Sequence, residues 1–202
     1  YSTNAATNQW NIITPTGTSG YVFNTVASIG NYVYLGTDHG VYKSSDGGSN
    51  WSQINTGLTT HLNITSIAIG FYYNSSTYKY ATTSNTYVFV GTSDGGVFAS
   101  TISGNTWTAT STGLTDSNVL DIEIDQYQVT QGGFTELYVT TPSGIFMSTT
   151  TGSRWQLDNS GFSGQPSKIV SSLDAQEIYT LSNDNKLYAR NLHSSSGVYE
   201  SW

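Results

Sequence analysis

The chain has 202 residues, with 6 basic and 13 acidic side chains and a formal net charge of −7. An acidic chain with so few cations lacks the basic surface that nucleic acids and anionic membranes attract, so we expect no nucleic acid partner. The absence of cysteine from the sequence excludes disulfides, thiol chemistry and cysteine-bound metals. No apolar run approaches the ~18 residues of a membrane span, so we expect no membrane insertion within this chain.

Short β-strands are predicted along the whole chain, in units that follow one another. Each candidate strand is a short run rich in Val, Ile, Tyr, Phe and Thr, bounded by Gly, Asn, Asp or Ser, and no stretch keeps a helical period. The first candidate is an isolated strand at residues 9–14. Four repeated units follow it, at approximately residues 21–56, 62–112, 117–160 and 167–202.

Five tryptophans mark the repeat, at positions 10, 51, 107, 155 and 202. Their spacing is roughly 40 residues once two insertions, 71–86 and 126–135, are set aside, and a period of this size with four strands is typical of β-propeller blades. We therefore predict an all-β fold and a single domain over residues 1–202. It should contain about four blades, each a four-stranded antiparallel sheet.

The sequence leaves open how the ring is completed. Residues 9–14 look like an outer strand without three strands of its own, so they could complete the last blade and close a four-bladed ring. Alternatively, the chain is a segment of a larger propeller, in which Trp202 begins a genuine fourth strand of the last unit.

The turn before Trp51 carries a family resemblance. Residues 44–51 read Ser-Ser-Asp-Gly-Gly-Ser-Asn-Trp, which resembles the Asp-box (BNR-type) hairpin S-x-D-x-G-x-x-W of sialidase-like, sortilin-like and xyloglucan-hydrolase-like β-propellers. Two later hairpins keep the Ser, Gly and Trp but have Ile102 and Thr150 where the Asp belongs. In these families the box is a scaffold hairpin away from the active centre, so the resemblance implies a fold and no site. The structural residues assigned to it are Ser44, Asp46, Gly48, Trp51, Ser100, Gly104, Trp107, Ser148, Gly152 and Trp155.

The intact box also decides the metal prediction. Asp46 is a short acceptor that can take backbone N–H bonds inside a tight turn. A strong calcium site needs 6–8 oxygen ligands, and this turn offers one carboxylate beside glycines. We therefore predict no metal and no cofactor.

Aromatic residues of the two insertions are the candidate binding residues. Both insertions fall between the first and second predicted strands of consecutive units, and equivalent loops project from one face of a propeller. Exposed rings suit stacking on carbohydrate or contact with a protein, whereas an extra hairpin that packs its own rings is the alternative. The candidates are Tyr72, Tyr73, Tyr78, Tyr80, Tyr127 and Phe134.

Two acidic residues form a second candidate site. Asp121 and Glu123 alternate with isoleucines on a predicted first strand, so both point to one face of it. On an innermost strand they could line the central channel as acids or as a cation site. The alternative is a solvated face without a role.

The residue inventory argues against an enzyme. The resemblance to sialidases implies an arginine cluster, yet the sequence has only Arg154 and Arg190. The resemblance to xyloglucan hydrolases implies two large propellers with a cleft between them, which this chain is too short to supply. No HExxH motif, phosphate loop or nucleophile elbow is present. We therefore predict no catalytic residues.

The remaining signals concern location and partners. The chain starts at Tyr1 rather than Met, and N-x-S/T sequons predict glycosylation at Asn50, Asn63 and Asn74. These features favour an extracellular or cell-surface protein. The predicted function is a non-catalytic surface, adhesion or assembly module whose partners are cell-surface or secreted proteins, or glycans, within a larger assembly. A fragment of a secreted propeller glycoside hydrolase is the alternative from another class.

Overall fold

The computed structural model describes residues 10–71, 86–125, 136–172 and 177–192. Within these ranges the chain forms 15 β-strands and no helix, so no helix there could span a membrane. The strands form four antiparallel sheets, each made of strands that are consecutive in the chain. The predicted all-β fold of four blades is therefore confirmed.

The sheets are the blades, numbered here in chain order. The first blade contains β1 (Phe23–Ile29), β2 (Tyr32–Thr37), β3 (Gly40–Ser44) and β4 (Ser52–Gln53). The second contains β5 (Ile64–Phe71), β6 (Thr86–Thr92), β7 (Gly96–Thr101) and β8 (Thr108–Ala109). The third contains β9 (Asp121–Asp125), β10 (Glu136–Thr141), β11 (Gly144–Ser148) and β12 (Gln156–Leu157). The fourth contains β13 (Pro166–Ser171), β14 (Glu177–Ser182) and β15 (Leu187–Asn191), with no fourth strand among the described residues.

A threonine closes the turn between the second and third strands of three blades. Thr37 donates its hydroxyl to the carbonyl of Gly40 at 2.9 Å, and the same hydroxyl accepts the backbone N–H of His39. Thr92 and Thr141 make the equivalent bonds in the next two blades. Because the side chain satisfies turn groups that the sheet leaves unpaired, each turn is tight, as the Gly-bounded pattern predicts.

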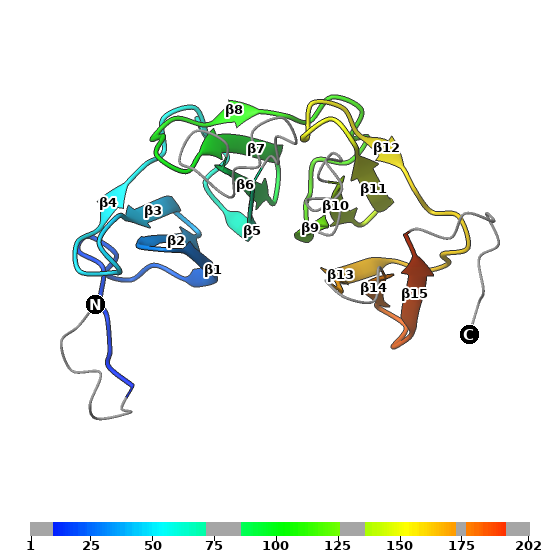
Figure 1. Cartoon of the computed structure of the whole chain (residues 1–202), viewed down its shortest axis with the longest axis horizontal. Helices are drawn as coiled ribbons and strands as arrows, with labels where there is room; N and C mark the ends of the chain where they lie inside the picture. Colours follow the sequence, from blue (N-terminus) through cyan, green and yellow to red (C-terminus); the bar gives the residue numbers. More distant parts are fainter. Residues whose placement is uncertain (1–9, 72–85, 126–135, 173–176, 193–202) are drawn as a thin grey trace, which may run out of the picture.

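The four blades lie side by side along an arc (Figure 1). The first strand of each blade lies on the inside of the arc and the short fourth strands lie on the outside. First strands of successive blades pack against one another, from β1 to β5, β9 and β13. The arc does not close, because β1 and β13 stand apart at its two ends.

The open arc bears on the two sequence alternatives. A closed four-bladed ring is not formed, and the arrangement is that of a propeller segment. Residues 10–14 form no strand and lie at the end of the arc opposite to β15, so their predicted pairing with the last blade is not made in this structure. Gln9 and Trp202 lie outside the described residues. The predicted domain boundaries remain a proposal.

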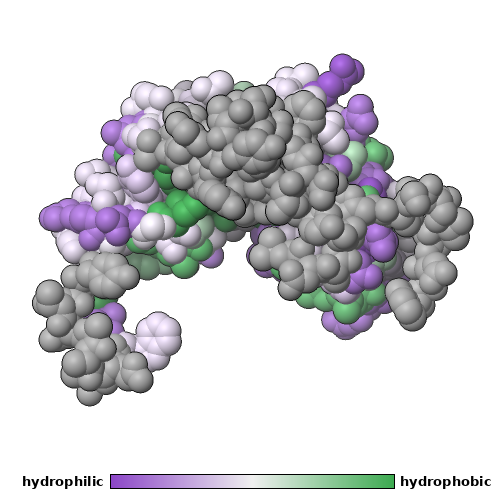
Figure 2. Space-filling model, viewed as in Figure 1, coloured by the Kyte–Doolittle hydropathy of each residue, from purple (hydrophilic) through white to green (hydrophobic). Residues whose placement is uncertain are grey.

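The interior of the molecule lies between the blades rather than at one centre. Three clusters of buried side chains fill the spaces between successive blades, and Trp107 and Trp155 belong to the first and second clusters. Each of these indoles lies on the preceding blade: Trp107 donates its N–H to the carbonyl of Ile54, and Trp155 donates to that of Thr110. An indole therefore fastens the second blade to the first and the third blade to the second. Figure 2 shows hydrophobic surface on both ends of the arc where they border its opening.

Candidate functional site

The intact Asp-box hairpin ties its own turn. The Oδ1 atom of Asp46 accepts the backbone N–H of Asn50 at 2.8 Å, and Oδ2 accepts the side-chain amide of Asn50 at 2.6 Å. Ser44 Oγ accepts the N–H of Gly48 at 2.8 Å. The bonds from Asn50 lower the pKa of Asp46 to about 2. These contacts are internal to the hairpin, so Asp46 holds the turn in shape.

The two altered boxes have different local structures. In the third hairpin, Thr150 Oγ1 accepts the N–H of Arg154 at 3.0 Å, and Ser148 Oγ accepts the N–H of Gly152. Threonine thus supplies the oxygen that aspartate supplies in the first hairpin. In the second hairpin, Ile102 is buried in the cluster between the first and second blades, and its carbonyl accepts the hydroxyl of Tyr34. Ile102 therefore packs into the core at the position where the first hairpin has the polar Asp46.

Asp121 and Glu123, the predicted channel acids, bind the neighbouring first strands. Oδ1 of Asp121 accepts the hydroxyl of Ser66 in the second blade at 2.9 Å, and Oδ2 accepts the backbone N–H of Ile169 in the fourth blade at 3.1 Å. Oε1 of Glu123 accepts both the N–H and the hydroxyl of Ser171, at 3.1 and 2.6 Å. Both carboxylates thus connect the third blade to its neighbours. Among the described residues no cluster of three His, Asp or Glu could hold a metal ion.

The pKa of Glu123 makes one of these connections sensitive to pH. Burial raises this pKa above its ordinary value of 4.5, the hydrogen bonds from Ser171 oppose the rise, and the charges of Asp121 and Asp125 add to it. A raised carboxyl pKa means that the folded state favours the protonated form. The stabilising contribution of this proton is therefore complete at pH values below the unfolded pKa and is lost as pH rises through the folded pKa.

Glu123→Gln is expected to become more stable than the wild type as pH rises. Glutamine keeps an oxygen for Ser171 and carries no charge, so its stability should not decline through this window. Urea unfolding at a series of pH values should give equal midpoints near pH 3 and a difference in favour of the variant that opens above about pH 4.5. Glu136→Gln, at a half-buried carboxylate, controls for the loss of one negative charge. A variant less stable than the wild type at pH 7 would contradict this account.

A cavity of about 700 Å³ lies between the third and fourth blades. Its wall is largely apolar and aromatic, and the rings of Phe162 and Tyr188 stand 4.6 Å apart there. Asp158 forms an ion pair with Arg190, and Glu177 accepts the hydroxyl of Tyr179. The carboxylates at this cavity are therefore already engaged by neighbouring groups. Sequence patterns give no sign of this site, because its residues lie up to 52 positions apart along the chain.

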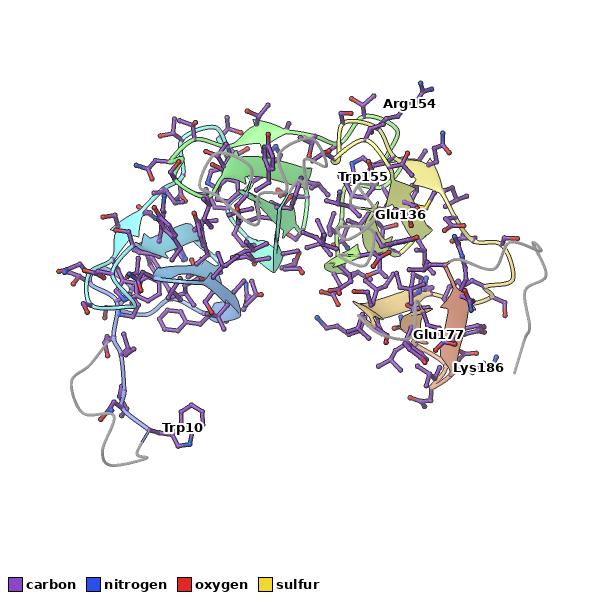
Figure 3. The ribbon with its side chains drawn as sticks, viewed as in Figure 1. Trp10, Glu136, Arg154, Trp155, Glu177 and Lys186 are labelled. Carbon is purple, nitrogen blue, oxygen red and sulfur yellow. The ribbon has the colours of Figure 1, made fainter. Side chains whose placement is uncertain are left out.

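The two arginines lie in different surroundings. Arg190 is half-buried in its pair with Asp158. Arg154 is exposed and points outward from the outer side of the arc (Figure 3). Figure 3 also shows Glu136 and Trp155 on the third blade and Glu177 and Lys186 on the fourth. The structure does not bring the two arginines together.

The remaining sequence candidates divide between described and undescribed parts. The insertion candidates Tyr72, Tyr73, Tyr78, Tyr80, Tyr127 and Phe134 lie outside the described residues, as does Asn74. The two other sequon asparagines are exposed, but their amides are engaged: Asn50 donates to Asp46, and Asn63 donates to Ser93. Glycosylation remains a prediction.

The chain resembles known proteins in its structure. No protein-family model and no curated protein matches it. Several solved structures do match. An ancestral GH74 enzyme is 19% identical with a TM-score of 0.57, and the match covers 89% of this chain and 25% of that one. YCF48 bound to D1 peptide is 16% identical with a TM-score of 0.59, over 85% of this chain and 51% of that one.

A third match is the extracellular domain of BT4673 from B. thetaiotaomicron, at 16% identity and a TM-score of 0.61. It covers 93% of this chain and 22% of that chain. The chain thus spans between about a fifth and a half of these three structures. At identities this low, the structural likeness establishes the fold alone. The chain therefore has the β-propeller fold, as four successive blades in an open arc.

Proposed function

We propose that the chain is a non-catalytic extracellular module that binds a protein or a glycan through the face carrying its two insertions. The observation that carries this proposal is the position of the insertions. Residues 72–85 connect β5 to β6, and residues 126–135 connect β9 to β10, so both join the first and second strands of adjacent blades. Because equivalent connections of a propeller emerge on one face, we expect the aromatic residues of both insertions to share a face.

The chemistry of the described residues supports binding over catalysis. The buried or half-buried carboxylates of Asp121, Glu123, Asp158 and Glu177 all accept hydrogen bonds or pair with a cation. A pair of carboxylates that acts as general acid and base needs one member that is available to protonate the leaving group. The matched YCF48 structure contains a peptide, and the matched BT4673 domain is extracellular, which is consistent with a protein partner outside the cell.

A fragment of a secreted glycoside hydrolase is the second candidate, because GH74 enzymes are among the structures with the same fold. Incubation with xyloglucan and chromatography of the products separates the two. Released oligosaccharides would favour the hydrolase. Binding without turnover would favour the module.

Truncating Tyr72, Tyr73 and Tyr78 together to alanine is the direct test of the binding face. The three residues lie outside the repeated strands, so we expect the melting temperature to change by only a few degrees. Affinity for the strongest ligand found on a glycan array, or in a screen of peptides, should fall by ~2 kcal/mol or more, the scale of interface hot spots.

The control for this triple variant is Leu157→Ala, at an exposed residue of β12 outside both insertions. It should leave the affinity unchanged. An extra hairpin that packs its own rings makes the opposite prediction for the triple variant. Stability would then fall by several kcal/mol while binding is retained, and the proposed face would be wrong.

A further inference from the structure

The same binding position for a tryptophan, called here the tryptophan seat, occurs between the first and second blades and between the second and third. Trp107 and Trp155 each directly precede a fourth strand. Each donates two hydrogen bonds to the linker that follows the fourth strand of the blade before it. The indole N–H binds the carbonyl three positions after the preceding tryptophan, and the backbone N–H binds the carbonyl five positions after it. The accepting residues are Ile54 and Thr56 for Trp107, and Thr110 and Thr112 for Trp155.

A glycine completes each seat. Gly57 and Gly113 follow directly after the backbone acceptors, and both have a positive φ. A Cβ atom on Gly57 would lie 2.0 Å from the carbonyl oxygen of Trp107, and one on Gly113 would lie 2.2 Å from that of Trp155. Only glycine allows the two backbones to approach so closely. The seat therefore consists of two carbonyls and one glycine at fixed distances from a tryptophan in the sequence.

The cavity between the third and fourth blades has the same components. Counting from Trp155, the two carbonyls belong to Asp158 and Ser160, and the glycine is Gly161, with φ +76°. All three residues line the cavity of about 700 Å³. No atom lies within 4 Å of the position that a Cβ on Gly161 would take. This cavity therefore has the composition of a third tryptophan seat. No tryptophan among residues 10–71, 86–125, 136–172 and 177–192 lies in it, and Trp202 is outside these ranges.

Trp10 begins a segment that matches the missing element. The two residues after the tryptophan form the fourth strand in β4, β8 and β12, and after Trp10 these are Asn11 and Ile12. The side chains of Trp10 and Ile12 are fully exposed, at 103% and 97%. Ile13 lies against the hairpin of the first blade, where its Cδ1 comes 3.4 Å from the Cβ position of Gly48. The segment therefore projects from the first blade toward the place of a preceding blade (Figure 3).

The first blade also exposes a face that is buried in each of the other three blades. Val26 pairs with Leu35 in the register of β1 and β2, and the equivalent residues of the next three blades are isoleucines. Val26 is 66% exposed, whereas all three isoleucines are buried against the preceding blade. The isoleucines are Ile67, Ile122 and Ile169.

The fourth blade exposes the opposite face. Leu187 is 65% exposed, and the equivalent third-strand residues of the other blades are buried against the following blade. Those residues are Val41, Val97 and Ile145. Each end of the arc thus carries one half of an interface that the chain forms three times internally.

We infer that two copies of this chain close one ring, in which Trp10 of each copy enters the cavity of the other. The Val26 face of one copy then packs on the Leu187 face of its partner, and residues 10–13 add the fourth strand to β15. A head-to-tail interface that closes after two copies covers the Val26 and Leu187 faces of both copies.

A second copy fits the arc better than closure of one chain on itself. A four-bladed ring would require β1 to meet β13, which stand apart at the ends of the arc (Figure 1). Closing that distance within one chain would change the angles between blades that the packed tryptophans and the bonds of Asp121 and Glu123 fix. Packed interfaces resist such deformation. A second copy reaches both ends with the three internal interfaces unchanged.

The test is the mass of the 202-residue chain in solution, measured by light scattering at micromolar concentration. We expect twice the 21.8 kDa of one chain. Trp10→Ala, Val26→Glu, Leu187→Glu and Gly161→Asn should each give the single-chain mass with an unchanged circular dichroism spectrum. Asparagine tolerates a positive φ, so Gly161→Asn should block the approach of the tryptophan and keep the turn. Leu157→Glu and Gly30→Asn, at an exposed strand position and an open turn, should keep the double mass.

Mixing the variants tests the head-to-tail geometry. A mixture of Val26→Glu and Leu187→Glu should recover the double mass in part, because one of its two interfaces is then wild type on both sides. A single-chain mass for the wild type would overturn the inference and favour closure within one chain or a larger protein. A double mass that survives Trp10→Ala or Leu187→Glu would also overturn it, because the copies would then meet elsewhere.

Discussion

Replacing Trp155 by alanine is expected to lower the free energy of unfolding by about 3–5 kcal/mol, the usual cost of truncating a buried tryptophan. The indole is 2% exposed and fills the space between the second and third blades, so its removal leaves a large cavity. The carbonyl of Thr110 also loses the indole N–H that it accepts. Urea unfolding followed by circular dichroism measures this change.

Leu157→Ala is the control for Trp155→Ala. Leu157 lies two residues further along the same hairpin and is 58% exposed, so its truncation should change the stability by no more than about 0.5 kcal/mol. A loss below about 1 kcal/mol in Trp155→Ala would mean that the blades do not depend on this indole, and the account of the interior given by the buried clusters would be wrong.

Gly113→Ala should have the second largest effect, a loss of about 2–5 kcal/mol. A residue with a Cβ pays ~1–2 kcal/mol at this left-handed φ of +95°, and forcing atoms into a packed site adds ~1–3 kcal/mol. Here the obstacle is the backbone oxygen of Trp155, 2.2 Å from the new methyl group, which cannot move without breaking the seat. Thermal and urea unfolding both report the loss.

Gly30→Ala separates the two parts of that effect. Gly30 has φ +57° and no atom within 4 Å of its Cβ position, so the variant should show the conformational part alone, ~1–2 kcal/mol. Equal losses in Gly30→Ala and Gly113→Ala would show that the close approach of Trp155 contributes nothing.

The architecture could be predicted from sequence because its signals are local. Each strand is bounded by turn residues within a few positions, and each tryptophan follows its hairpin directly, so the repeat is visible without any knowledge of packing. The structure confirms four blades and places both insertions between first and second strands. The open arc, in contrast, depends on angles between blades, and these follow from side chains that meet only in three dimensions.

The roles of individual polar residues were harder to predict for the same reason. The alternation of Asp121 and Glu123 correctly implies a shared face, but it does not say that both carboxylates accept hydrogen bonds from β13. Ile102 looks like a damaged Asp-box until Tyr34, 68 positions earlier, is found beside it in the interior. The pairing of Asp158 with Arg190 spans 32 positions and has no local signature. Such contacts become predictable only once neighbouring blades are in place.

The placement of each tryptophan on the blade before its own has a consequence for how the molecule opens. The second and third blades each pack an indole against the preceding blade, so local unfolding of either one also exposes the interior of its neighbour. Backbone amides of the first three blades are therefore expected to exchange with solvent as one cooperative unit. The described residues of the fourth blade give no indole to the third. In the proposed ring Trp10 of the partner copy takes that place, so hydrogen exchange of β13, β14 and β15 is expected to slow when two copies assemble.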